Sequence, residues 1–446
     1  MAFLCLYLSF FLFIFASRFT VPVDIFIINP YKKKLMKEQT KQLNGIFNAM
    51  KKWQIYVASL AMMITLSACS DDDAPVSGPT PTKNDAKLVL DKDKLAMIYS
   101  LRDLEGNKGR IYEMDYTVDY MLDKALNFGI DGTDRLKMFV ALNLMDTIIS
   151  TKSMNISYDA GCSAFACPDK TSGDYIMGRN FDFNHKDKNS NRIMIPVIAV
   201  HTAPAGGKKS VSFVDGQFVD YKSGFYTDGE SDLSMLMALP YLLLDGINED
   251  GFAVSVLKLD GNPTQQDKAG KKKIFTTIAM RMLLDRASTV KQAYAMLKEF
   301  NMCMDRDSAS YHFFMADATG DYAIVEYTNN NLKDYPRDME VLTGNDTLRC
   351  VTNFYVSPTM GETEHGMKFS DHGMDRYLDL RKGLLEHNYV MTPEEGMSLL
   401  KQVAQGPESQ RSTGFTQWSE IFNLTKKKVT MSILREWDKK FSFEVR

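Results

Sequence analysis

The sequence has few of the residues that build metal centres, disulfide frameworks or nucleic-acid surfaces. Its six histidines form no closely spaced pattern with acidic residues, so no metal site and no cofactor are predicted. Its six cysteines are spaced irregularly, which argues against a disulfide framework, although a Cys303–Cys350 bridge stays open. The net charge is only −3, and no stripe of lysine and arginine is interleaved with aromatic residues. Nucleic acid is therefore not expected as a partner.

A lipoprotein signal is predicted near the N-terminus. Met50-Lys51-Lys52 is basic, residues 53–65 are mostly apolar, and Leu66-Ser67-Ala68-Cys69 has the form of a lipobox. These features predict a signal peptide over residues 50–68 and lipid attachment to Cys69. A plain transmembrane helix is disfavoured, because the apolar run is shorter than the roughly 20 residues that span a bilayer.

The segments on either side of this signal are interpreted as targeting and linker sequence. Residues 1–49 read as an upstream extension of the gene model, with a true N-terminal membrane anchor as the alternative. Residues 69–83 are rich in Pro, Ser, Gly and Thr and read as a flexible tether. Their cluster Asp71-Asp72-Asp73 resembles the export signal of surface lipoproteins in some Gram-negative bacteria, although a solvated linker explains it equally well. A lipid-anchored protein of the bacterial cell envelope is expected, in the outer membrane or periplasm.

The folded part is expected to be of the α+β class. Residues 84–161 show apolar side chains at helical spacing and are predicted to be a helical segment. From residue 162 to 446, short strands dominate at first, a long amphipathic helix is predicted over 276–300, and a strand over 349–355. Strands in two groups with helices between them suggest two sheets sandwiched by helices.

Cys162 is the candidate nucleophile. It follows Gly161, and Arg179-Asn180-Phe181-Asp182 lies a short distance further along. This layout is typical of an N-terminal-nucleophile amidohydrolase, in which the chain is cut before the cysteine. The freed α-amine, with a pKa of about 7.7–8.0, can then take up the thiol proton.

The neighbouring residues suit this chemistry. We expect Asp182 to orient the ammonium, and Arg179 to lower the thiol pKa and keep the Asp182 carboxylate ionised. Gly161 tolerates the strained backbone that an internal acyl shift needs. Two alternatives stay open, namely that Cys162 is a small buried hydrophobe or forms a disulfide with Cys167.

Together with Cys162, Arg179 and Asp182, several later motifs resemble the choloylglycine hydrolase family. They are Asp245-Gly246-Ile247-Asn248-Glu249-Asp250-Gly251-Phe252, Val351-Thr352-Asn353, Asp375-Arg376-Tyr377 and Thr416-Gln417-Trp418-Ser419-Glu420. The resemblance implies a four-layer αββα sandwich. It also implies that the Asn353 amide helps form the oxyanion hole and that Arg376 lies near the active site.

Two features depart from the family pattern. Lys258 stands where bile salt hydrolases have Asn and penicillin V acylases have Tyr. The resemblance makes its backbone N–H the second oxyanion donor, while its side chain either favours a substrate carboxylate or points to solvent. A cut at Cys69 leaves a long segment ahead of Cys162, more like the small chain of acid ceramidase and N-acylethanolamine acid amidase.

The sequence thus predicts a self-processing cysteine amidohydrolase for linear amides of apolar acyl groups. Fatty acid amides and N-acyl amino acids are favoured, conjugated bile salts come second, and penicillin V third. The small and large chains are expected to stay associated, and a homo-oligomer stays open. The alternative from another class is a non-catalytic surface lipoprotein that binds amphipathic ligands.

Overall fold

The computed structural model describes residues 83–145, 160–187, 189–261, 263–304, 310–328, 338–361, 372–406 and 414–446. All of them belong to one compact unit, Pro79–Arg446. The predicted signal peptide, the lipid-attachment residue Cys69 and nearly all of the tether lie outside the described residues.

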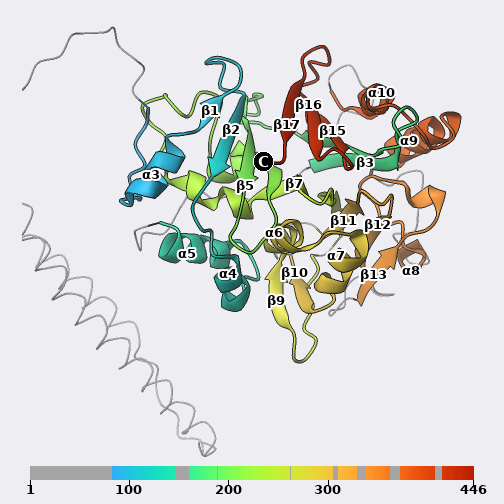
Figure 1. The fold of residues 1–446 in the computed structure, drawn as a ribbon, viewed down its shortest axis with the longest axis horizontal. Coiled ribbons are helices and arrows are strands. Elements are labelled where there is room, and N and C mark those ends of the chain that lie inside the picture. The colour runs from blue at the N-terminus through green and yellow to red at the C-terminus, as the bar shows by residue number, and fades with distance from the viewer. Residues whose placement is uncertain are drawn as a thin grey trace, which may run out of the picture. The chain divides into compact units, whose positions relative to one another are not determined.

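A nine-stranded sheet forms one half of this unit (Figure 1). Its order is β1-β2-β5-β6-β7-β8-β11-β12-β13, and all neighbours are antiparallel except β2 and β5. The strands are β1 (Arg102–Asp103), β2 (Ile111–Tyr116), β5 (Val197–Thr202), β6 (Ser210–Asp215), β7 (Leu243–Asn248), β8 (Ala253–Leu259), β11 (Ser310–Ala316), β12 (Tyr322–Thr328) and β13 (Asp338–Leu342).

A six-stranded antiparallel sheet faces the first one. Its order is β14-β3-β4-β15-β16-β17, with β3 (Ala160–Pro168), β4 (Tyr175–Phe183), β14 (Cys350–Val351), β15 (Thr416–Asn423), β16 (Lys428–Ile433) and β17 (Phe441–Glu444). Aromatic rings join the two sheets: the Phe213 ring of β6 lies 6.4 Å from that of Phe422 and 5.2 Å from that of Phe443. The main apolar core is therefore between the sheets.

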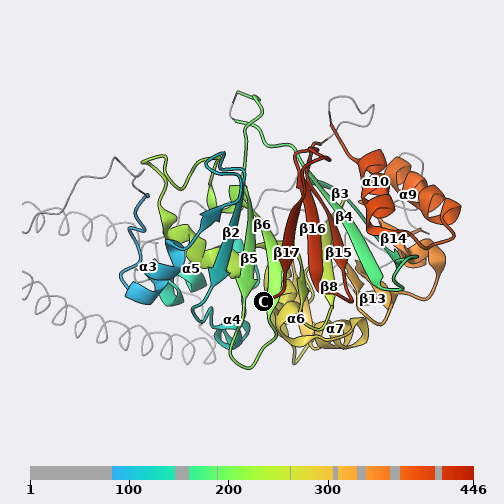
Figure 2. The ribbon, with the colours of Figure 1, turned by 45° about the horizontal axis from the view of Figure 1, so that its top comes forward.

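Helices cover the outer faces of the two sheets. Helix α6 (Thr276–Arg286) packs on β7 and β8, while α9 (Met374–Glu386) and α10 (Pro393–Val403) pack on the six-stranded sheet, as Figure 2 shows at its right. The result is the αββα layering that the sequence predicted. The remaining elements are α3 (Lys92–Ile98), α4 (Leu122–Phe128), α5 (Thr133–Asn143), α7 (Val290–Leu297), α8 (Pro358–Gly361), the 3₁₀ segments Gly216–Val219, Leu233–Tyr241 and Asp346–Leu348, and the parallel pair β9 (Lys272–Phe275) and β10 (Phe300–Cys303).

The segment before Cys162 is not purely helical, which corrects the sequence prediction. It contributes β1 and β2, and β2 pairs in parallel with β5 over six residues. From Tyr112 to Tyr116, β2 alternates buried with half-buried residues, as a strand does. In its described residues, the helices of this segment are α3, α4 and α5.

The helix predicted over residues 276–300 is also wrong in its length. Helix α6 ends at Arg286, α7 begins at Val290, and Phe300 starts β10. The Asn248 amide donates to the carbonyl oxygens of Leu284 and Ala287 at 2.9 and 2.7 Å. It satisfies carbonyl groups that a helix end leaves without partners, so the break is stabilised from the neighbouring sheet.

The strand predicted over residues 349–355 is much shorter in the structure. Only Cys350 and Val351 pair in the sheet, and the chain leaves it at Thr352. The next residue, Asn353, is thereby released from the sheet to turn its side chain toward Cys162. Within the described ranges, no helix combines the length and the apolar character needed to cross a membrane.

Candidate active site

Cys162 is near the start of β3, in the interior between the two sheets, and is only 2% exposed. Its neighbour Gly161 is paired with Asp182 of β4. A Cβ atom at position 161 would lie 2.1 Å from Gln405 Nε2 and 3.3 Å from Asp182 Oδ2. A larger residue here would therefore displace the Gln405 side chain. Gly161 lies in β3, outside the left-handed region.

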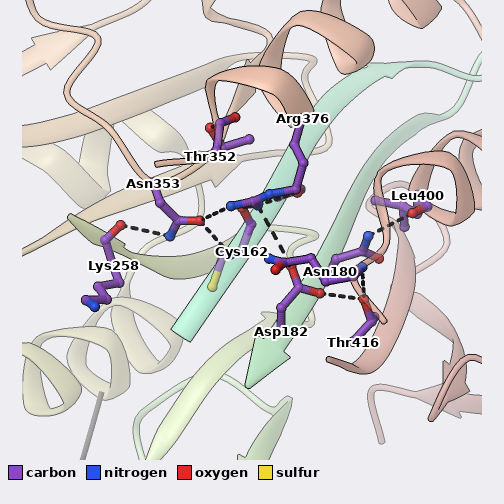
Figure 3. A network of polar contacts seen from close by, with 12 residues as sticks. Cys162, Asn180, Asp182, Lys258, Thr352, Asn353, Arg376, Leu400 and Thr416 are labelled. Atoms are coloured by element: carbon purple, nitrogen blue, oxygen red, sulfur yellow. Dashed lines mark hydrogen bonds and ion pairs between the residues drawn. The ribbon is translucent and has the colours of Figure 1, made fainter. Parts of the chain in front are cut away.

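Asn353 is the polar centre of the site (Figure 3). Its Oδ1 accepts hydrogen bonds from the Cys162 backbone N–H and from Arg376 Nη2, both at 2.7 Å. Its Nδ2 donates to the Lys258 carbonyl oxygen at 2.8 Å. These contacts fix the orientation of the amide. An amide nitrogen carries two N–H groups, so one donor remains for a further oxygen.

Arg376 joins Cys162 to the first turn of α9. Its Nη1 donates to Ser163 Oγ at 3.0 Å and to the Cys162 carbonyl oxygen, and lies 3.8 Å from Asp182 Oδ2. The turn before α9 is built around this side chain. Gly373 has φ of 83°, and a Cβ there would lie 2.6 Å from Arg376 Nη2.

Asp182 is buried and held by neutral donors. Thr416 Oγ1 donates to its Oδ1 at 2.5 Å, and Gln405 Nε2 donates to its Oδ2 at 2.9 Å. The guanidinium near Asp182 is that of Arg376. Arg179, which we expected to keep Asp182 ionised, also interacts with the charge of Asp182, although its ion pair is with Asp245.

Arg179 reaches Cys162 from the other side. Its Nη2 lies 3.8 Å from Cys162 Sγ and donates to the Val256 carbonyl oxygen at 3.2 Å. Its Nε lies 2.9 Å from Asp245 Oδ2, with both side chains fully buried. Glu420 lies directly opposite Arg179 in the β4–β15 pair. One guanidinium thus faces two buried carboxyl groups.

The two carboxyl groups behind Arg179 share one negative charge. Burial, followed by the nearby Asp245 charge, raises the pKa of Glu420 well above its usual range. Burial also raises the pKa of Asp245, while the Arg179 charge opposes that rise. Two carboxylates in a dry site cannot both ionise readily, so Glu420 holds the proton and Asp245 pairs with Arg179.

The pKa of the Cys162 thiol is raised, which differs from the sequence-based expectation. Burial is the largest cause, and the Asp182 charge adds to it. The charges of Arg179 and Arg376 and the Lys258 backbone N–H favour the thiolate, but they do not outweigh burial. Because the thiolate is the nucleophile and the charges of the two arginines do not suffice to form it, the site needs a group that accepts the thiol proton.

Lys258 is on β8, and its backbone and side chain face different surroundings. Its carbonyl oxygen binds Asn353, and its N–H points at the Cys162 sulfur. Its ammonium lies 3.8 Å from Asp260 Oδ1, and the side chain is 15% exposed. Of the two orientations left open by the sequence, the structure favours pairing with Asp260, away from the Asn353 amide (Figure 3).

The cysteines form no bridges in the described part of the chain. Cys162, Cys167, Cys303 and Cys350 are all buried free thiols, so the Cys303–Cys350 and Cys162–Cys167 alternatives are not realised. Cys162 and Cys167 are an odd number of residues apart on β3 and therefore face opposite sides of the sheet. Over these same ranges, no cluster of His, Cys, Asp and Glu side chains could hold a metal ion.

The structure brings together Cys162, Arg179, Asp182, Asn353, Arg376 and the Lys258 backbone. Sequence reasoning missed Gln405, which approaches Asp182 from the segment after α10 and carries no local signal. It named Asp245 and Glu420 only as parts of motifs. Their positions beside Arg179 follow from strand pairing between segments far apart in the chain.

Comparisons with known proteins agree with this geometry. Residues 162–372 match the model of the linear amide C–N hydrolases, choloylglycine hydrolase family. This range contains Cys162, Arg179, Asp182, Asp245, Lys258 and Asn353, whereas Arg376, Gln405, Thr416 and Glu420 lie beyond it. No curated protein matched the chain.

Solved structures with a similar fold include two variants of the conjugated bile acid hydrolase from Clostridium perfringens. Each is 15% identical and covers 64% of this chain and 92% of its own, with TM-scores of 0.42 and 0.43. Penicillin V acylase from Agrobacterium tumefaciens is 15% identical and covers 64% of this chain and 86% of its own, with a TM-score of 0.41. The assignment depends on the family model rather than on these weak similarities. On that match, residues 162–372 of the chain are similar to the choloylglycine hydrolase family of linear amide C–N hydrolases.

Proposed function

We propose that this hydrolase is a self-processing cysteine amidase, in which cleavage of the Gly161–Cys162 bond makes Cys162 the first residue of the large chain. The observation that carries the proposal is the surroundings of the Cys162 nitrogen and sulfur. The nitrogen lies 2.7 Å from Asn353 Oδ1, and Arg179 lies 3.8 Å from the sulfur. A raised thiol pKa leaves the uncut chain without an activated nucleophile, and a freed α-amine supplies the missing base.

The steps of hydrolysis follow from these groups. The α-amine of Cys162 takes the thiol proton, and the sulfur attacks the amide carbonyl carbon. The oxyanion that forms is held by the remaining Asn353 N–H and the Lys258 backbone N–H. The α-ammonium returns its proton to the leaving amine, and a thioester remains. Water, deprotonated by the same α-amine, then releases the acid and restores the thiol.

The surroundings of the α-amine suit a group that gains and loses a proton during the reaction. Asn353 Oδ1 is an acceptor for an ammonium as well as for the present N–H. The Asp182 carboxylate is next to Gly161 across the β3–β4 pair and stabilises the ammonium. Thr416 and Gln405 fix the orientation of that carboxylate.

The favoured substrates are N-acyl amides with an apolar acyl group, such as fatty acid amides or N-acyl amino acids. Conjugated bile salts are the second candidate and penicillin V the third. The preference rests on the long segment ahead of Cys162, which resembles the small chain of fatty-amide hydrolases. The non-catalytic alternative, a binder of amphipathic ligands, predicts an intact Gly161–Cys162 bond.

We also propose that the small chain stays bound after cleavage. Its strand β2 pairs with β5 inside the nine-stranded sheet. Ion pairs connect it to the C-terminus: Arg446 Nη2 lies 2.8 Å from Asp115 Oδ1 and 3.2 Å from Glu113 Oε1. Loss of β2 would expose the edge of β5. Through Cys69, the small chain would tether the enzyme to the cell-envelope membrane.

The proposal is tested by turnover of four amides: an N-acylglycine, an N-acylethanolamide, a glycine-conjugated bile salt and penicillin V. Wild-type protein is compared with Cys162→Ala. Hydrolysis of an N-acyl amide with the highest kcat/KM, absent in the variant, supports the proposal. Binding without turnover of any of the four supports the non-catalytic alternative.

A further inference from the structure

A second buried network lies behind Asn353 and is not used in the steps above. His312 of β11 is fully buried. Its Nε2 lies 2.9 Å from the Thr352 carbonyl oxygen, and its Nδ1 lies 3.0 Å from Glu326 Oε1. A carbonyl oxygen only accepts hydrogen bonds, so Nε2 is the donor. His312 thus binds the peptide group that leads directly into Asn353.

Glu326 holds the same loop from its far end. Its Oε1 accepts the Val356 N–H and its Oε2 accepts the Ser357 N–H, both at 3.0 Å. His312 therefore binds the chain directly before Asn353, and Glu326 binds it after Asn353, at Val356 and Ser357. This loop has left the sheet after Val351 and has no strand partner at these residues. The His312–Glu326 pair replaces strand pairing as the support of the loop.

The same support reaches Arg376 and β8. Thr352 Oγ1 donates to the Gly373 carbonyl oxygen at 2.9 Å, at the turn that begins α9 and precedes Arg376. On the other side, His312 is paired with Leu257 in the β8–β11 ladder, next to Lys258. Both oxyanion donors, the Asn353 amide and the Lys258 N–H, are therefore tied to elements that His312 contacts.

We propose that His312 and Glu326 are positioning residues of the oxyanion hole, which act through the Thr352 carbonyl to hold the Asn353 amide. The proposal rests on the proposed function, because it assigns Asn353 to the oxyanion. It explains why a hydrogen-bonded histidine and glutamate are buried so far from solvent. Burying such groups is costly unless each is paired, and here each is paired with the loop itself.

The experiment compares His312→Leu, His312→Gln and Glu326→Gln with wild type. Leucine removes both hydrogen bonds, whereas glutamine keeps an N–H that can reach the Thr352 carbonyl. We expect His312→Leu to lower kcat by about 10- to 100-fold with KM within about twofold, since a small displacement of one oxyanion donor has this effect. His312→Gln should recover most of the loss. The kcat of Glu326→Gln should lie between the kcat values of His312→Leu and His312→Gln.

A matched control is available in the same sheet. His201 of β5 is also buried, and its Nε2 lies 2.8 Å from Glu113 Oε1 of β2. His201→Leu removes a partly buried histidine–carboxylate pair on β5 and β2, away from Asn353. It should lower the melting temperature while leaving kcat unchanged. An equal loss of kcat in His201→Leu and His312→Leu would show a general effect of instability and would overturn the proposal.

A second readout separates this inference from the proposed function. A fatty aldehyde adds to the Cys162 thiol to give a hemithioacetal, in which the thiol proton goes to the aldehyde oxygen and that oxygen occupies the oxyanion hole. His312→Leu should weaken aldehyde binding by the same 10- to 100-fold factor, while alkylation of Cys162 by chloroacetamide keeps its rate.

If wild type binds the aldehyde but hydrolyses no amide, the proposed function fails and the aldehyde comparison still decides the role of His312. Wild-type aldehyde affinity in folded His312→Leu overturns the inference. The inference is also overturned if Cys162 in wild-type protein reacts with chloroacetamide but forms no adduct with the aldehyde. Should His312→Leu not fold, the same criteria apply to Glu326→Gln.

Discussion

Two buried arginines flank Cys162, and their partners differ. Arg376 binds neutral oxygens of Cys162, Ser163 and Asn353 and approaches Asp182 only to 3.8 Å. Arg179 lies 2.9 Å from Asp245, with Glu420 beyond it, and is 3.8 Å from the sulfur. The Arg179 charge is thus compensated by the Asp245 carboxylate. Arg376 instead orients Cys162, Ser163 and Asn353 through hydrogen bonds.

The arginines do not activate the thiol, because burial outweighs their charges. Arg179 favours the thiolate more than Arg376 does, even though it is paired with Asp245 at 2.9 Å. The pKa of the thiol stays raised despite two arginines. The account therefore assigns the role of base to the α-amine that cleavage would create at Cys162.

The largest effect on activity is expected on the Arg376 side. Asp182→Asn keeps the shape of the side chain but removes the charge that stabilises the ammonium, so kcat should fall by about 10²- to 10⁴-fold. Asp250→Asn is a control on an exposed turn aspartate. Steady-state kinetics with a single N-acyl amide measures both. A near wild-type kcat in folded Asp182→Asn would remove Asp182 from the mechanism.

On the Arg179 side, the larger effect is on folding. Arg179→Met leaves the Asp245–Glu420 pair without its cation, and breaking a buried pair by removing one partner costs about 3–5 kcal/mol. Chemical denaturation should show this loss at pH 7. The double variant Arg179→Met with Asp245→Asn should recover part of it. No recovery would mean that the arginine stabilises the fold through contacts other than the Asp245 carboxylate.

A smaller effect is expected in the pH dependence of stability. Below about pH 4.3, the ordinary pKa of glutamate, Glu420 is protonated in both the folded and the unfolded chain. Above it, the unfolded chain releases this proton while the folded chain keeps it, because the pKa of Glu420 is raised. Glu420 therefore lowers the free energy of unfolding by up to about 1.4 kcal/mol for each pH unit in that window.

Glu420→Gln removes this titration. The variant should match wild type near pH 4 and be more stable at pH 7, with a flatter curve between them in urea unfolding. If the free energies of unfolding of the variant and wild type change with pH in parallel, Glu420 is ionised in the folded protein.

The smallest effect is expected at Lys258. Its ammonium pairs with the exposed Asp260 at 3.8 Å, and such pairs are worth about 0–1 kcal/mol. Lys258→Met should therefore change the ratio of kcat/KM for an N-acylglycine and the matching N-acylethanolamide by less than about fivefold. A change of tenfold or more would place the ammonium at the substrate head group instead.

The sequence predicted the residues around Cys162 better than their pairings. The sequence could single out five residues because each stands in a short motif: Cys162, Arg179, Asp182, Asn353 and Arg376. The partner of Arg179 could not be predicted, since Asp245 and Asp182 both lie in such motifs and only the sheet packing decides between them. Gln405, His312 and Glu326 act through contacts between distant elements and leave no local pattern.

Element boundaries show the same limit. The helical spacing over 276–300 is real, but Asn248 of another strand ends α6 at Arg286. The sequence did not reveal strand β2, because its partner β5 is far along the chain, on the other side of the predicted cleavage point. Local propensity cannot report partners that only the folded chain supplies.

The central claim is that a new α-amine at Cys162 activates the sulfur, and the mass of the denatured protein tests it most directly. Wild-type protein should separate into two chains, the larger beginning at Cys162, and the fraction cleaved should match the fraction of active sites. Cys162→Ala should give one uncut chain. A wild-type protein that hydrolyses amides at full rate while the Gly161–Cys162 bond is intact would contradict the account.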